Sequence, residues 1–113
     1  SLENGETRNE ILSYDLKTND FIKGTPSFPM ADMGSAKTLK VASVPSGWDG
    51  GWHPTPLKQW CVTLSGSATM ETSDKKIIEL KGGVAVLLDD TFGKGHHTTV
   101  VGDDDWCSML VAV

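Results

Sequence analysis

The chain has 113 residues, of which 38% are hydrophobic and 22% charged, and this size and composition suit one soluble globular domain. Its net charge is −5, from 15 acidic and 10 basic residues, which argues against nucleic acid as a partner because phosphates are bound by a basic surface. No apolar run approaches the roughly 18 residues of a membrane-spanning helix, and no signal peptide is visible. We therefore expect a cytoplasmic protein that binds neither nucleic acid nor membrane.

Short strands are the only regular elements that the sequence predicts. Helical spacing of apolar residues is not sustained over three turns, whereas short apolar runs bounded by turn residues recur at intervals of about ten residues. This pattern indicates an all-β sandwich or barrel. In chain order, the expected strands are residues 11–17, 38–44, 57–64, 67–72, 75–80, 84–88, 96–101 and 106–113.

The segments between these strands divide the chain into an arm and a barrel. Residues 24–34 hold two prolines and two glycines, and we expect this irregular segment to lie across the body of the domain. Residues 45–52 are expected to form a glycine-rich loop. The expected domains are therefore residues 1–34, an N-terminal arm with one strand, and residues 35–113, the β-barrel.

Two acidic turns and one glycine pair complete the prediction of loops. Asp89-Asp90 and the aspartates at 103–105 are interpreted as solvated turns. Gly93 and Gly95 are expected to adopt positive φ, which glycine tolerates without steric cost.

Two predicted strands are too apolar to face water on either side. In residues 57–64, Trp60, Val62 and Leu64 share one face, and residues 84–88 are apolar on both faces. A second layer must cover these strands, and either the N-terminal segment or a second subunit provides it. We expect a homodimer. For Cys61 and Cys107 we expect free buried thiols, with a disulfide as the alternative in an oxidising compartment.

The residues around His53 have a spacing that suggests a chemical role. His53, Thr55 and Gln59 have the same parity, so they project to one side wherever the chain is extended. His96 follows a second glycine-rich loop, whereas its neighbour His97 must point the other way, toward the surface or an interface. Trp48 and Trp52 flank the glycines before His53 and either line the mouth of a pocket or pack against the barrel.

The stretch from Gly47 to Gly66 resembles the first motif of the cupin superfamily, G-x5-H-x-H-x3-4-E-x6-G. All the spacings match, with Thr55 in the place of the second histidine and Gln59 in the place of the glutamate. The second motif, G-x5-P-x-G-x2-H-x3-N, keeps only Gly93 and His96. The chain is also similar to a subgroup of small single-domain cupins in three stretches, WHPTPLKQ (52–59), TLSG (63–66) and GGVAVLLDDTFGKGH (82–96).

The resemblance implies a cupin-type double-stranded β-helix, or jelly-roll barrel, with His53, Thr55, Gln59 and His96 lining an internal ligand pocket. It also implies a divalent metal ion, which could be Fe, Mn, Ni, Cu or Zn, held by His53, Gln59 and His96. A glutamine oxygen is neutral and binds a divalent ion more weakly than a carboxylate does, so the expected affinity is lower than that of the full cupin set.

Three functions follow from these expectations. The first is a metal-dependent enzyme acting on a small organic acid, a sugar or a related metabolite. The second is a non-catalytic module that binds a small ligand without metal, using the histidines and Gln59 as hydrogen-bonding anchors. The third is a structural protein in which the two histidines only form hydrogen bonds within the core. The fold does not choose among them, because a barrel of this kind hosts many functions.

Overall fold

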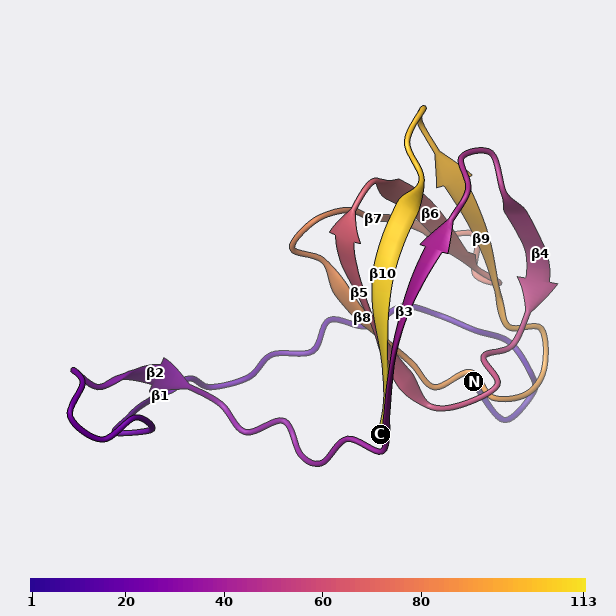
Figure 1. Cartoon of the computed structure of the whole chain (residues 1–113). Coiled ribbons are helices and arrows are strands. Elements are labelled where there is room, and N and C mark those ends of the chain that lie inside the picture. The colour runs from indigo at the N-terminus through magenta and orange to yellow at the C-terminus, as the bar shows by residue number, and fades with distance from the viewer.

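The structure, a computed structural model, describes residues 1–113 and consists of β-strands connected by turns and loops (Figure 1). No helix in it has the length and apolar character needed to span a membrane. The strands are β1 (Lys17–Asn19), β2 (Phe28–Met30), β3 (Thr38–Val44), β4 (Asp49–His53), β5 (Gln59–Ser65), β6 (Ser67–Thr72), β7 (Ile77–Leu80), β8 (Ala85–Leu88), β9 (His96–Val101) and β10 (Trp106–Ala112).

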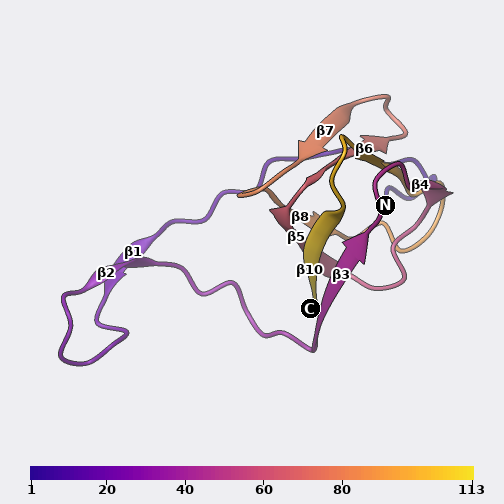
Figure 2. The same cartoon turned by 45° about the horizontal axis from the view of Figure 1, so that its top comes forward.

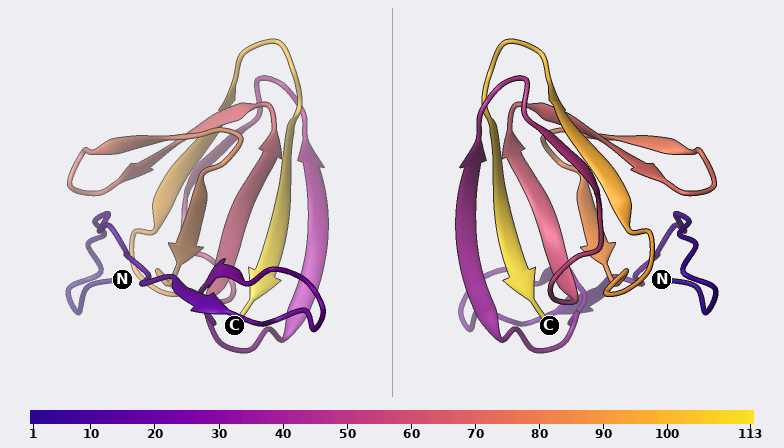
Figure 3. Two further views of the ribbon diagram at one scale, coloured as in Figure 1. Left: turned by 90° about the vertical axis from the view of Figure 1, so that its left-hand side faces the viewer. Right: turned by 90° about the vertical axis from the view of Figure 1, so that its right-hand side faces the viewer.

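Strands β3 to β10 form two four-stranded antiparallel sheets, with strand orders β3-β10-β5-β8 and β4-β9-β6-β7. The pairs β3:β10, β4:β9, β5:β8 and β6:β7 are nested, so the chain behaves as one long hairpin rolled around a barrel axis. The pairs β5:β10 and β6:β9 then complete the sheets, which face each other in Figure 3. This arrangement is the double-stranded β-helix, or jelly roll, and it confirms the predicted fold class.

The core lies between the inward faces of the two sheets. Alternate residues of β6 are buried, as expected for a strand with one face toward the interior. Trp106 is buried in the core and donates a hydrogen bond from Nε1 to Thr63 Oγ1 at 3.0 Å. Both cysteines are free, and burial raises the pKa of the Cys61 thiol. The buried apolar residues of the core are Cys61, Ala68, Met70, Leu80, Val100 and Trp106.

Most barrel strands lie where the sequence predicts them, and β4 is the exception. Strands β3, β6 and β9 have the predicted bounds, but residues 49–53 form a strand where a glycine-rich loop was expected. The glycines do not prevent pairing with β9, because the register shifts between Asp49 and Trp52 and a bulge takes up the irregular residues. This strand carries His53 into the barrel wall.

The N-terminal arm differs most from the prediction. Residues 11–16 are exposed and form no strand, so the strand expected at 11–17 is wrong. Residues 24–34 do not lie across the body either, because β1 and β2 pair only with each other and project away from the barrel (Figures 1 and 2). The local alternation of apolar residues predicted a strand, but a strand also needs a partner, and none is adjacent.

The segment that forms hydrogen bonds with the body is residues 1–9. Thr7 N donates to Ser73 Oγ at 2.6 Å, and Ser73 N donates to Thr7 Oγ1 at 2.9 Å. Thr7 Oγ1 also donates to the Gly95 carbonyl oxygen at 2.7 Å. These bonds hold the N-terminal segment against the β6–β7 turn and the loop before β9.

Candidate functional site

The fold brings His53 and His96 together. They are register partners in the β4:β9 pair, and their ring centroids are 4.8 Å apart. His96 is buried, and His53 is half-buried. Two residues that are 43 positions apart in the sequence therefore lie side by side on the inner wall of the barrel.

A buried carboxylate fixes the orientation of the His96 ring. Asp90 Oδ2 lies 2.6 Å from His96 Nδ1, and both residues are buried. A carboxylate oxygen at this distance accepts from an imidazole N–H, so Nδ1 carries a proton, and the neutral form of this tautomer has its lone pair at Nε2. The interpretation of Asp90 as a solvated turn residue is therefore wrong, although Asp89 is exposed as predicted.

A backbone carbonyl orients the His53 ring in the same way. His53 Nδ1 lies 3.0 Å from the Gly51 carbonyl oxygen, which can only accept, so this ring too is protonated at Nδ1. Its Nε2 likewise presents a lone pair. The site thus consists of two adjacent imidazoles, each held at Nδ1 and each free to accept at Nε2.

A close backbone contact sets the distance between the two histidines. Gly95 adopts φ +72°, as predicted for this glycine, and lies directly against the end of β4. A Cβ atom at this position would be 2.0 Å from the His53 carbonyl oxygen and 2.3 Å from Pro54 N. Only glycine permits this approach, which places the loop before His96 against the strand end that carries His53.

Thr55 and Gln59 form a second pair beside the histidines. Gln59 Nε2 donates to Thr55 Oγ1 at 3.3 Å, and Thr55 Oγ1 donates to the Leu57 carbonyl oxygen at 2.6 Å. Thr55 N also donates to the Asp90 carbonyl oxygen at 3.0 Å, which fixes the loop that carries Asp90. Gln59 is the register partner of Leu88 on the inward side of the sheet. Neither Thr55 nor Gln59 lines either of the two cavities near His96.

Two adjoining cavities meet at His96. The inner cavity has a volume of about 140 Å³ and lies in the barrel, with His53, Trp48 and Thr98 among its lining residues. The outer cavity has a volume of about 720 Å³ and lies between the barrel and the N-terminal segment. Four residues line both cavities, namely Met70, Val86, Leu88 and His96.

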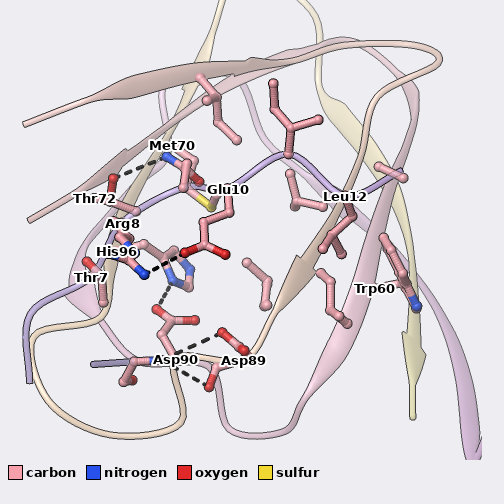
Figure 4. Close-up of a pocket in the computed structure, with 18 of the residues that line it drawn as sticks. Thr7, Arg8, Glu10, Leu12, Trp60, Met70, Thr72, Asp89, Asp90 and His96 are labelled. Carbon is pink, nitrogen blue, oxygen red and sulfur yellow. Dashed lines mark hydrogen bonds and ion pairs between the residues drawn. The ribbon is translucent and has the colours of Figure 1, made fainter. Parts of the chain in front are cut away.

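The outer cavity has a polar end and an apolar end (Figure 4). His96 and Asp90 lie at the polar end, where Arg8 Nη2 forms an ion pair with Glu10 Oε1 at 2.7 Å. Leu12 and Trp60 lie toward the other end. Arg8, Glu10 and Leu12 belong to the arm and carry no motif, so sequence reasoning did not find them.

The two tryptophans near His53 differ in their surroundings. Trp48 lines the inner cavity, and its ring packs over Gly50, where a Cβ atom would be 2.3 Å from the ring and 3.1 Å from His53 Cε1. Trp52 points outward and contacts His97, with ring centroids 5.7 Å apart.

His97 faces the surface, as predicted, and its Nε2 lies 2.6 Å from Asp49 Oδ1. The backbone N–H of Gly51 and then His97 hold the pKa of Asp49 below its usual value.

No protein-family model matches this sequence, and no curated protein matches it. Solved structures are similar to it, however. A conserved protein of unknown function from Streptococcus pyogenes aligns with a TM-score of 0.49 and 19% identity, over 66% of this chain and 61% of its own. The capsular polysaccharide assembling protein CapF from Staphylococcus aureus aligns with a TM-score of 0.48 and 23% identity, over 88% of this chain and 29% of its own.

An RmlC-like cupin protein from Desulfovibrio desulfuricans aligns with a TM-score of 0.47 and 12% identity, over 85% of this chain and 95% of its own. The chain spans less than two thirds of the length of the Streptococcus pyogenes protein and less than a third of CapF. The cupin-type fold of this chain follows from its own strand order.

The donor set fits a divalent metal ion only in part. Two imidazoles with Nδ1 held by an oxygen acceptor are typical metal ligands, and Asp90 corresponds to the carboxylate that often orients such a histidine. No group of three or more His, Cys, Asp or Glu side chains is placed to hold an ion. Gln59 is the third predicted donor, and its amide nitrogen is engaged by Thr55.

Proposed function

We propose that this protein binds a small hydroxylated metabolite, a sugar or a hydroxy acid, with the ligand's hydroxyl groups donating hydrogen bonds to Nε2 of His53 and His96. The observation that carries the proposal is the buried Asp90–His96 pair, whose imidazole ring lies 4.8 Å, centroid to centroid, from the ring of His53, with Nδ1 of each ring held by an oxygen acceptor. Hydroxyl groups are the matching partners, because they donate to acceptors such as Nε2 and also accept from neighbouring groups.

The cavities support this function by their size and lining. The outer cavity, which His96 lines, has a volume of about 720 Å³ and falls in the range of roughly 300–1,000 Å³ typical of small-molecule sites. His53 lines only the adjoining inner cavity of about 140 Å³, so a ligand that reaches both histidines would extend from the outer cavity into the inner one. Apolar side chains such as Met70, Val86 and Leu88 surround the polar end, so water is partly excluded from the histidines. Hydrogen bonds to a ligand are stronger in such a setting than in bulk water.

A divalent metal ion at the same two nitrogens is the second candidate. The hydrogen bonds at Nδ1 favour it, because they fix the tautomer that a metal ligand needs. Two imidazoles and a neutral amide leave the ion's charge uncompensated by protein, so the affinity would be modest. The candidate ions are Fe, Mn, Ni, Cu and Zn.

A thermal-shift screen with sugars and hydroxy acids tests ligand binding. A ligand present at about 100 times its Kd should stabilise the fold by about 2.7 kcal/mol. In the variant His53→Phe, which removes one acceptor, binding should weaken about tenfold and the stabilisation should fall by about half. The variant His97→Phe is the matched control, because its side chain faces the surface, and it should retain the full shift.

The same preparation, made without a polyhistidine tag, separates the two candidates. Titration with each of the candidate metals should give uptake of less than about a tenth of an equivalent if the site serves a metal-free ligand. Uptake of one equivalent that is lost in His53→Phe would support the metal instead. Absence of any ligand shift and any metal uptake would leave the histidines a structural role and contradict both proposals.

A further inference from the structure

Two apolar surfaces of this chain are unpartnered, and one is the projecting arm. Residues 15–34, called here the hairpin arm, extend away from the barrel (Figures 1 and 2). A hairpin of two three-residue strands is at best marginally stable alone in water. Its large apolar side chains are nevertheless exposed, namely those of Leu16, Phe21, Ile22, Phe28 and Met33.

The other surface is the outer face of the β3-β10-β5-β8 sheet. Its register places two cross-strand rows on this face, each with one residue from every strand. None of the eight side chains is charged, which is typical of the centre of an interface. The rows are Leu39, Val111, Trp60 and Leu87, and Val41, Met109, Val62 and Ala85.

The chain's own N-terminal segment covers only one side of this face. Tyr14 contacts Trp60, with ring centroids 6.5 Å apart. At the β3 edge, Leu39 is 69% exposed and Val41 is 70% exposed. The apolar rows therefore continue from a covered part at β5 to an uncovered part at β3.

We propose that the hairpin arm lies on the uncovered β3 side of this face in a second copy of the chain, so that two chains exchange arms in a symmetric dimer. Both complementary surfaces are present once in every chain, so two reciprocal contacts close the assembly around a two-fold axis. A separate partner protein would cover one surface and leave the other bare.

The size of the arm fits this occupant. Stable interfaces use about 20–30 residues from each partner, and each hairpin arm supplies about 20. The shape of the single chain agrees, because its radius of gyration is 15.9 Å, against about 13 Å expected for a compact domain of this length. The projecting arm accounts for the excess.

Light scattering coupled to size-exclusion chromatography tests the exchange on the full chain. The wild type should have twice the monomer mass of 12.1 kDa. Two variants should each raise the dimer Kd by about 100-fold: Phe21→Asp with Ile22→Asp in the arm, and Leu39→Asp with Val41→Asp on the sheet. Ile77→Asp is the matched control, because Ile77 is 62% exposed but lies on the other sheet, and it should remain dimeric.

Mixing the two double variants distinguishes arm exchange from a direct contact between sheets. The sheet variant retains an intact arm and the arm variant retains an intact sheet, so a mixture should form a heterodimer with one of the two contacts. The proposal would be overturned by any of four results: a monomeric wild type, an arm variant that stays dimeric, a control variant that dissociates, or a mixture that forms no heterodimer. Near-ultraviolet circular dichroism verifies that every variant keeps its core.

Discussion

Replacement of Gly95 by alanine should destabilise the protein by about 4 kcal/mol or more, among the largest effects of any single substitution. The new Cβ would lie 2.0 Å from the His53 carbonyl oxygen and 2.1 Å from its carbonyl carbon. Both are backbone atoms of the end of β4, so no side-chain rotation can relieve the contact. The strand end and the loop before His96 must separate, which also moves the two histidines apart.

Gly102→Ala is the matched control for this prediction. Gly102 has φ +82°, similar to Gly95, but a Cβ atom there has no neighbour within 4 Å. The substitution Gly102→Ala should lower the free energy of unfolding only by the strain of the left-handed backbone conformation, about 1 kcal/mol. Urea denaturation of both variants measures the difference, and equal free energies of unfolding would show that the contact of Gly95 with β4 does not restrict the site.

Asp90→Ala should lower the free energy of unfolding by about 2–3 kcal/mol and abolish ligand or metal uptake at the site. The substitution leaves the Nδ1–H of His96 buried without its acceptor, and an unsatisfied buried donor carries a cost of this order. Without the carboxylate, the ring also loses the constraint that keeps the lone pair at Nε2. A neutral oxygen at the same place, in Asp90→Asn, should restore part of the stability.

Asp89→Ala is the control that the chain itself offers. The Asp89 side chain is 67% exposed, and its ion pair with the N-terminal amine, at 3.6 Å, is at the surface. Its loss should change stability by less than about 0.5 kcal/mol. Thermal unfolding of the two alanine variants provides the comparison, and the role given to Asp90 would be wrong if both behaved alike.

The pair Asp89-Asp90 also shows where prediction from sequence fails. Nothing in the sequence distinguishes the two aspartates, because both follow the same strand and precede the same loop. The fold distinguishes them through Thr55, whose backbone N–H holds the Asp90 carbonyl oxygen and thereby turns that residue inward. The available signal for a buried carboxylate was the position of this aspartate pair just after a strand that is apolar on both faces. The same position is also compatible with an exposed turn.

Prediction succeeded where a period of two fixes the outcome. His96 is buried and His97 faces outward because neighbours on a strand alternate. Trp60 and Val62 share a face for the same reason, but the expectation that water does not reach this face is wrong at Leu64, which is 49% exposed. The projecting arm could not be predicted from local pattern. The alternation in residues 11–17 meets the local requirement for a strand, but whether it pairs depends on an edge that only the assembled structure provides.

The most direct test of the site is a measurement of the histidine tautomers by long-range ¹⁵N–¹H nuclear magnetic resonance at about pH 8, where imidazole is neutral. The hydrogen bonds to Asp90 and Gly51 predict protonation at Nδ1 for His96 and His53, with contacts between their ring protons. His97 bonds Asp49 through Nε2 and should show the opposite tautomer in the same spectrum. Protonation of His53 or His96 at Nε2, or rings too far apart for such contacts, would contradict a site built on two adjacent lone pairs.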